Sequence, residues 1–90
     1  MTPQVLAPYV LTALFAAQVE GKSSSLDTLV EAIKVRRGDL RRTVTALHRE
    51  GLVDVRRMRL TMLGFGLATM YASQELAPLR RPQRAVVAAA

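Results

Sequence analysis

Among the residues with functional side chains, arginine is the most concentrated, and most arginines cluster in the middle of the sequence. Between positions 36 and 59 there are eight arginines and three acidic residues, a local excess of five in a chain of formal net charge +6. A guanidinium stays charged and can donate paired hydrogen bonds to phosphate or to guanine. This clustering predicts an acidic partner, and it favours nucleic acid. The competing interpretation is a solvated basic face that binds nothing.

Other reactive groups are too few to predict catalysis or metal binding. The chain has one histidine, His48, and no cysteine, which leaves no thiolate ligands and no disulfides. The serines at 23–25 have no base–carboxylate pair nearby to activate them. Gly64 and Gly66 could begin a dinucleotide fingerprint, but Thr69 stands at its third glycine position. We therefore expect a protein that is not an enzyme and that binds no cofactor and no metal.

The arginines at 36–49 fall on one side of a predicted helix. At about 100° per residue, Leu40, Val44 and Leu47 form a single apolar stripe. The opposite side is small, polar and basic, and it consists of Gly38, Arg41, Arg42, Thr45 and Arg49. Gly51 suits the left-handed position that ends a helix. The segment is thus predicted to pack inward through its apolar stripe and to present its cationic side outward.

A short helix and a short hairpin are predicted before and after this segment. Residues 26–34 carry one apolar face, with Ser24 or Ser25 as the N-cap. In residues 52–61, apolar and polar side chains alternate, which is typical of a strand pair. The tip contains neither Gly nor Asn, so a two-residue turn is disfavoured there.

The two outer predicted helices are apolar on more than one side. The first is expected from Pro8 to about Glu20, and the last from Met62 to Leu76, with Thr61 as its cap. A surface helix of a lone domain needs one apolar face, so each helix is predicted to have a second packing partner, and we expect a homodimer. The residues expected at its interface are Leu11, Phe15, Phe65, Ala68, Ala72 and Leu76.

Secretion and membrane insertion are not expected. The apolar residues 9–19 are fewer than the roughly 20 that span a bilayer, and no basic segment precedes them. Attachment to a membrane surface through the first helix and the basic tail is a weaker alternative. We expect a cytoplasmic, nucleoid-associated protein with one domain over residues 1–77 and a basic, flexible tail over residues 78–90.

A family resemblance covers residues 29–64, LVEAIKVRRGDLRRTVTALHREGLVDVRRMRLTMLG. It rests on Val35 followed by a helix bearing Leu40 and Val44, on the passage LHREGLVDV, and on the later LTMLG. These pieces resemble the core of bacterial winged helix-turn-helix regulators of the MarR and PadR type. The resemblance implies a mainly α fold with a short β-hairpin, in the order helix, helix, recognition helix, hairpin, helix. Lys34 and Arg36 depart from the glycine and serine common there, and the wing is short.

By this resemblance, the helix from Arg37 to Arg49 would enter the major groove of double-stranded DNA. Arg41, Arg42 and Thr45 are then expected to contact bases, while Gly38 lets the backbone approach. The expected contacts to phosphates or the minor groove are Arg36, Arg37, Arg49, Arg56, Arg57 and Arg59. The predicted function is a homodimeric, sequence-specific transcriptional regulator. The alternative is a winged-helix module whose basic face binds an acidic protein.

Overall fold

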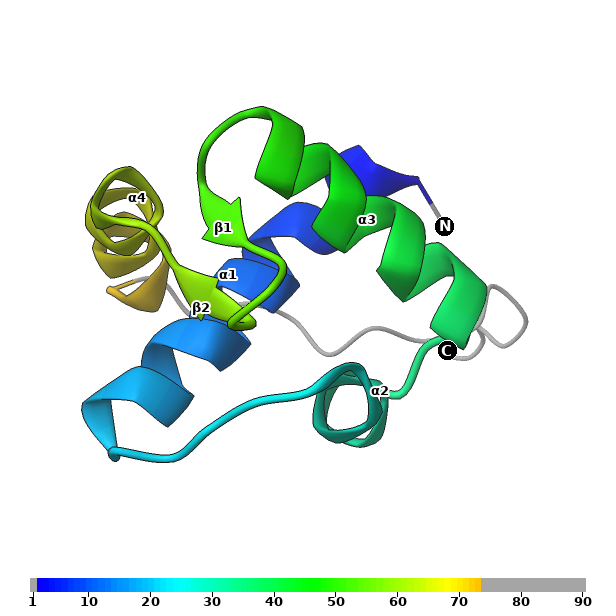
Figure 1. The fold of residues 1–90 in the computed structure, drawn as a ribbon, viewed down its shortest axis with the longest axis horizontal. Helices are drawn as coiled ribbons and strands as arrows, with labels where there is room; N and C mark the ends of the chain where they lie inside the picture. The colour runs from blue at the N-terminus through cyan, green and yellow to red at the C-terminus, as the bar shows by residue number, and fades with distance from the viewer. Residues whose placement is uncertain (1, 74–90) are drawn as a thin grey trace, which may run out of the picture.

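The computed structural model describes residues 2–73, which form four helices and a two-stranded hairpin (Figure 1). The elements are α1 (Pro3–Val19), α2 (Leu26–Ile33), α3 (Arg37–Arg49), β1 (Val53–Asp54), β2 (Arg59–Leu60) and α4 (Met62–Ala72). The strands are antiparallel, with Val53 opposite Leu60. The expected mainly helical fold with a short hairpin is therefore confirmed. The predicted tail, residues 78–90, lies outside the described residues.

α1 is the central helix of the fold (Figure 1). The elements α2, α3, α4 and β2 all contact it, and its buried residues are Leu6, Val10, Leu11 and Leu14. The prediction that it begins at Pro8 is wrong. Thr2 caps the helix by accepting the Val5 N–H, and Pro3 occupies the first turn, where a missing N–H costs no hydrogen bond. The expected burial of this helix on more than one side is confirmed.

Both ends of α2 are well defined, the first by a capping box and the second by a left-handed residue. The Ser25 hydroxyl accepts the Thr28 N–H at 3.2 Å, and the Thr28 hydroxyl accepts the Ser25 N–H at 2.8 Å, so both ends of this capping box are satisfied. Lys34 ends α2 in the left-handed region, with φ of 64°. A residue with a Cβ is disfavoured there by about 1 kcal/mol relative to glycine. Lys34 therefore adopts a backbone conformation that would be less strained for a glycine.

The chain leaves α3 through a Schellman motif and enters the hairpin. Gly51 has φ of 76°, and the Leu52 N–H donates to the Leu47 carbonyl at 2.9 Å. The side chains of Leu47 and Leu52 are both buried, as this motif favours. The expected stop of the helix at Gly51 is confirmed. Since the turn is anchored at both ends, α3 and the hairpin have a fixed relative direction.

The hairpin is short, and side chains hold it in place. The Asp54 carboxylate accepts the N–H groups of Arg56 at 3.0 Å and Arg57 at 3.4 Å, which orders the turn between the strands. The Leu60 N–H donates to Gln18 Oε1 of α1 at 2.6 Å. His48 of α3 donates from Nδ1 to the Val53 carbonyl at 3.1 Å. Helices on both sides therefore satisfy backbone groups that two such short strands leave unpaired.

α4 packs closely against the loop that precedes β1. Thr61 caps it as expected, because its hydroxyl accepts the Gly64 N–H at 3.1 Å. A Cβ built on Gly64 would lie 1.8 Å from the carbonyl oxygen of Leu52. Ala68, one turn later, is fully buried. The small residues of α4 thus allow close approach of the helix to the rest of the chain.

Candidate nucleic-acid interface

The outward face of α3 is the cationic surface that the helical projection predicted. Leu40, Val44 and Leu47 are buried in the core, together with Thr43, whose hydroxyl donates to the Asp39 carbonyl at 2.9 Å. All ten residues predicted to contact DNA are exposed. The stripe of leucines and valine fixes the rotation of the helix, and the opposite side must therefore face solvent. Exposure makes these side chains available to a ligand but does not identify it.

Four of the ten residues meet around one shallow hollow between α3 and the hairpin turn. Arg41 and Thr45 reach it from α3, and Arg56 and Arg57 reach it from the turn. Its volume is about 340 Å³, and its other lining residues are Ser24, Ser25, Leu26, Val44, Val55 and Met58. The rim is cationic, and much of the floor is apolar. This geometry suits a phosphate at the rim with a sugar or a base methyl group below it.

Three of the arginines already have carboxylate partners. Arg37 pairs with Asp27 at the start of α2, and Arg42 pairs with Asp39 within α3. Arg57 lies 4.0 Å from Asp54. The arginine side chains of these pairs are more than half exposed, and ion pairs at the surface contribute about 0–1 kcal/mol, so a phosphate can compete with the carboxylates for them. Of the three residues expected to contact bases, Arg41 and Thr45 face the hollow, whereas Arg42 is turned toward Asp39.

The five other arginines have no ion pair within residues 2–73. They are Arg36, Arg41, Arg49, Arg56 and Arg59. Of these, Arg41 and Arg56 line the same hollow, one from α3 and one from the turn. A guanidinium without a carboxylate partner can bind a phosphate without first losing an ion pair, and charge neutralisation of phosphates is the main source of affinity for DNA. Arg41 and Arg56 are therefore the strongest candidates for ligand contacts.

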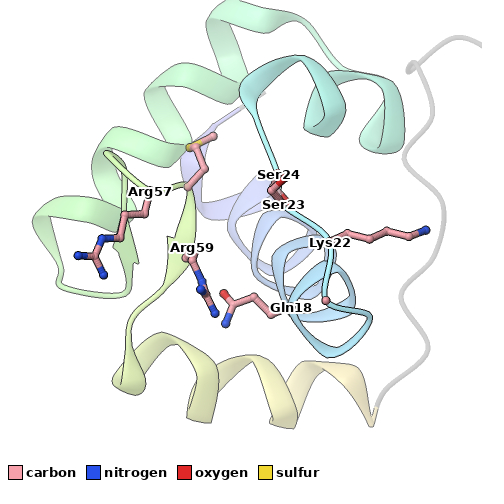
Figure 2. A pocket seen from close by; sticks show the side chains of 8 residues that line it. Gln18, Lys22, Ser23, Ser24, Arg57 and Arg59 are labelled. Carbon is pink, nitrogen blue, oxygen red and sulfur yellow. The ribbon is translucent and has the colours of Figure 1, made fainter.

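A second, smaller hollow lies beyond the hairpin, between β2 and the loop after α1 (Figure 2). Its volume is about 210 Å³, and the residues that line it include Gln18, Ser23, Ser24 and Arg59. Figure 2 shows Arg59 extending toward Gln18, while the amine of Lys22 points away. Arg57 lines both hollows. Arg59 is thus separated from the α3 hollow, and the structure does not gather all ten residues into one site.

The remaining predicted residues extend this surface along α3. Arg36, Arg37 and Gly38 lie at its N-terminal end, and Arg49 is its last residue. At 1.5 Å per residue, the thirteen residues of the helix span about 20 Å. A Cβ on Gly38 would have no atom within 4 Å, so the open approach expected at this glycine is present.

Gln18 is a positioning residue that the sequence did not reveal. Its amide oxygen accepts the Leu60 N–H across 42 positions of sequence. The signal that could have found it is its polarity, since α1 contains only one other amide side chain, Gln4. A polar group among buried residues needs a partner, and here the partner is the edge of the hairpin.

Two of the six expected dimer residues are misplaced. Leu11 is 1% exposed and Ala68 is fully buried, so both belong to the core of the protomer. Phe15 and Phe65 pack on each other with ring centroids 5.0 Å apart. Phe15 and Ala72 also line an open groove of about 460 Å³ between α1 and α4. Leu76 lies outside the described residues. The helical projection identified apolar faces on α1 and α4, but it assigned Leu11 and Ala68 to a dimer interface rather than to the core.

Comparison of the chain with protein-family models, with curated proteins and with solved structures found no match. Within residues 2–73, the helices are too short or too polar to cross a membrane. The same residues contain no cluster of three or more side chains of the kinds that ligate metal ions. The surface formed by α3 and the hairpin is therefore interpreted from its own geometry and charge.

Proposed function

We propose that this protein is a small, sequence-specific DNA-binding transcriptional regulator with a winged helix-turn-helix fold. The observation that carries the proposal is the meeting of Arg41 and Thr45 of α3 with Arg56 and Arg57 of the hairpin around one hollow. Two elements thereby present cations to the same ligand. The order helix, helix, helix, hairpin, helix supports the fold assignment. The protein would act in the cytoplasm, on double-stranded DNA, as a homodimer.

In this proposal, α3 lies in the major groove and the hairpin turn lies over the adjacent backbone. Double-stranded DNA carries one negative charge per roughly 1.7 Å of its axis, so a helix of about 20 Å faces several phosphates. In this proposal Arg41 and Thr45 read base edges, and Arg42 joins them once its pair with Asp39 is released. Arg36, Arg37 and Arg49 hold phosphates at the two ends of the helix. Since the Schellman motif and His48 fix the hairpin to α3, the two elements bind as one rigid surface.

The experiment is a salt titration of DNA binding by the double variant Arg41→Ala/Arg56→Ala. Duplexes selected from a random pool by the wild-type protein are titrated by fluorescence anisotropy at several salt concentrations. The variant should bind roughly 10- to 100-fold more weakly, and the slope of log affinity against log salt should fall by about 2. Lys22→Ala is the single-charge control, because Lys22 is exposed, pairs with Glu20 and does not line the hollow between α3 and the hairpin turn.

Failure of the wild-type protein to bind any duplex at low salt would overturn the proposal. An equal loss of binding free energy per charge removed, that is, a loss for the double variant about twice that for Lys22→Ala, would show that only net charge matters, and that α3 and the hairpin form no site.

The alternative function is binding of an acidic protein through the same face. It is favoured by the two carboxylates, Asp27 and Asp39, that already pair with Arg37 and Arg42 and show that this face accepts such groups. Capture of a protein partner that is lost in Arg41→Ala/Arg56→Ala, by a protein that binds no DNA, would support this alternative.

A further inference from the structure

The outward face of α4 exposes large apolar side chains. Met62 is 92% exposed, Leu63 is 65% exposed and Met70 is 64% exposed. The helix has no charged residue among its eleven positions. Its opposite side, with Gly64 and Ala68, is already buried against the rest of the protomer. Three long apolar side chains on one short helix form a patch of the kind that marks an interaction surface.

The polar groups on this face already have partners. At 100° per residue, Thr69 and Ser73 project on the same side as Met62. The Thr69 hydroxyl donates to the Gly66 carbonyl at 2.7 Å, and the Ser73 hydroxyl donates to the Met70 carbonyl at 2.8 Å. Burying a hydroxyl is unfavourable chiefly when its donor is left unpaired. The whole face can therefore be buried without leaving either hydroxyl donor unpaired.

The face is also symmetric about Gly66. Met62 lies four residues before it and Met70 lies four residues after it, so the three positions form one row along the helix. A Cβ on Gly66 would have no atom within 4 Å, which leaves open space at the centre of the row. In an isologous interface the same patch occurs twice, so where residue i of one copy contacts residue j of the other, residue j of the first also contacts residue i of the second. An antiparallel pair of α4 helices would place Met62 of one copy against Met70 of the other.

We propose that the outward face of α4 binds the same face of a second copy of this chain, antiparallel, with the two-fold axis beside Gly66. Charge favours this occupant over an anionic membrane, because α4 offers no lysine or arginine to lipid headgroups. The described arginines lie on α3, on the residue before it and on the hairpin, so two copies can join through α4 without bringing these cations together. Self-association does not depend on the proposed DNA binding.

The dimer should be weak and reversible. Within the described part of the chain, the eleven residues of α4 span about 16 Å, so their paired faces are smaller than the roughly 800 Å² per partner of a standard stable interface. We expect a dissociation constant on the order of 10 μM or above.

The test is sedimentation equilibrium of the full chain without DNA, over a wide concentration range. The variants are Met62→Glu, Met70→Lys and the two combined. Each charge agrees with the helix dipole at its own end of α4, so the helix should be retained, and circular dichroism checks this. Each single variant should weaken association by about tenfold or more, because it buries an unpaired charge. The combined variant should recover most of the loss, since opposite charges then meet across the axis. Ala32→Glu, an exposed position on α2, is the control and should have no effect.

A wild-type chain that remains monomeric at every concentration would overturn the proposal, whatever its affinity for DNA. If both single variants dissociate and their combination also stays monomeric, the antiparallel arrangement is wrong. Wild-type association that neither single variant weakens would place the contact on another face.

Discussion

The two outer helices and the segment between them have opposite chemistry. α1 and α4 together contain 28 residues, 17 in one and 11 in the other, without a single charged side chain. The segment from α2 to the hairpin carries eight arginines, and its nine basic and five acidic residues give it a net charge of +4 out of the chain's +6. The uncharged pair supplies the core against which α3 is held, and the charged segment supplies the outward surface. Structural support and the proposed ligand contact thus lie in different parts of a small chain.

This difference separates two kinds of sensitivity to substitution. In the uncharged helices, close packing means that one added carbon can displace the backbone. In the charged segment, exposed side chains can change without disturbing the core, and the effect should appear in ligand binding instead. A substitution in either part that changed both the free energy of unfolding and ligand binding would show that the two parts are coupled.

The largest effect is expected from Gly64→Ala in α4. The added Cβ would lie 1.8 Å from the Leu52 carbonyl oxygen, which is backbone and also accepts the Thr61 N–H at 3.0 Å. The free energy of unfolding should fall by about 3 kcal/mol, the upper end of the usual range for overpacking. Urea denaturation at low protein concentration measures it.

The matched control is Gly66→Ala, two residues further along the same helix, where the space around a Cβ is open. There the same change should raise stability by about 0.5–1 kcal/mol through helix propensity. Similar effects at both glycines would show that α4 does not pack as described.

A smaller effect is expected from Gln18→Ala, which removes a link between the uncharged helices and the hairpin. The Leu60 N–H would lose its partner, and leaving a partly buried donor unpaired costs about 1–2 kcal/mol. Urea denaturation gives the loss, and hydrogen exchange should show faster exchange of the Leu60 amide. Gln18→Glu keeps an acceptor oxygen and should retain most of the protection. An unchanged Leu60 exchange rate in Gln18→Ala would contradict the role given to this side chain.

The smallest effect is expected from Asp27→Asn at the start of α2. The change releases Arg37 from its ion pair, so DNA affinity should rise about two- to threefold at low salt, while the free energy of unfolding falls by roughly 0.5 kcal/mol through the helix dipole. Fluorescence anisotropy measures the affinity. Glu31→Gln removes the same charge from an exposed position of the same helix and is the control. If both variants gain equally, the pair with Arg37 does not restrain binding.

Local signals in the sequence predicted the helices and their ends well. α3 has the expected bounds, Arg37–Arg49, and Ser25, Gly51 and Thr61 stand at the expected caps and stop. Each of these helix ends depends on residues only a few positions apart, so the local sequence is enough to predict it. The start of α1 was missed because Pro8 was given the position that Pro3 occupies. Both prolines fit a first turn, and only the Thr2 cap distinguishes them.

Long-range contacts could not be read in the same way. Periodicity showed that α1 and α4 have several apolar faces but not which face meets which, and so Leu11 and Ala68 were assigned to a dimer interface. For the candidate site, exposure was predictable from the stripe that faces inward. The pairing of Arg37 with Asp27 joins side chains of α3 and α2, so it depends on how the two helices lie against each other, which the periodicity of either helix does not determine.

The central position of α1 has a consequence for how the chain is synthesised. Val19 ends α1, and Ala72 ends the helix that covers one of its sides. At about 5–20 residues per second, the 53 residues between them take roughly 3–10 s to translate. For that time the nascent chain presents an uncharged, apolar helix whose last partner does not yet exist. The packing of α1 can therefore be completed only after α4 has been synthesised.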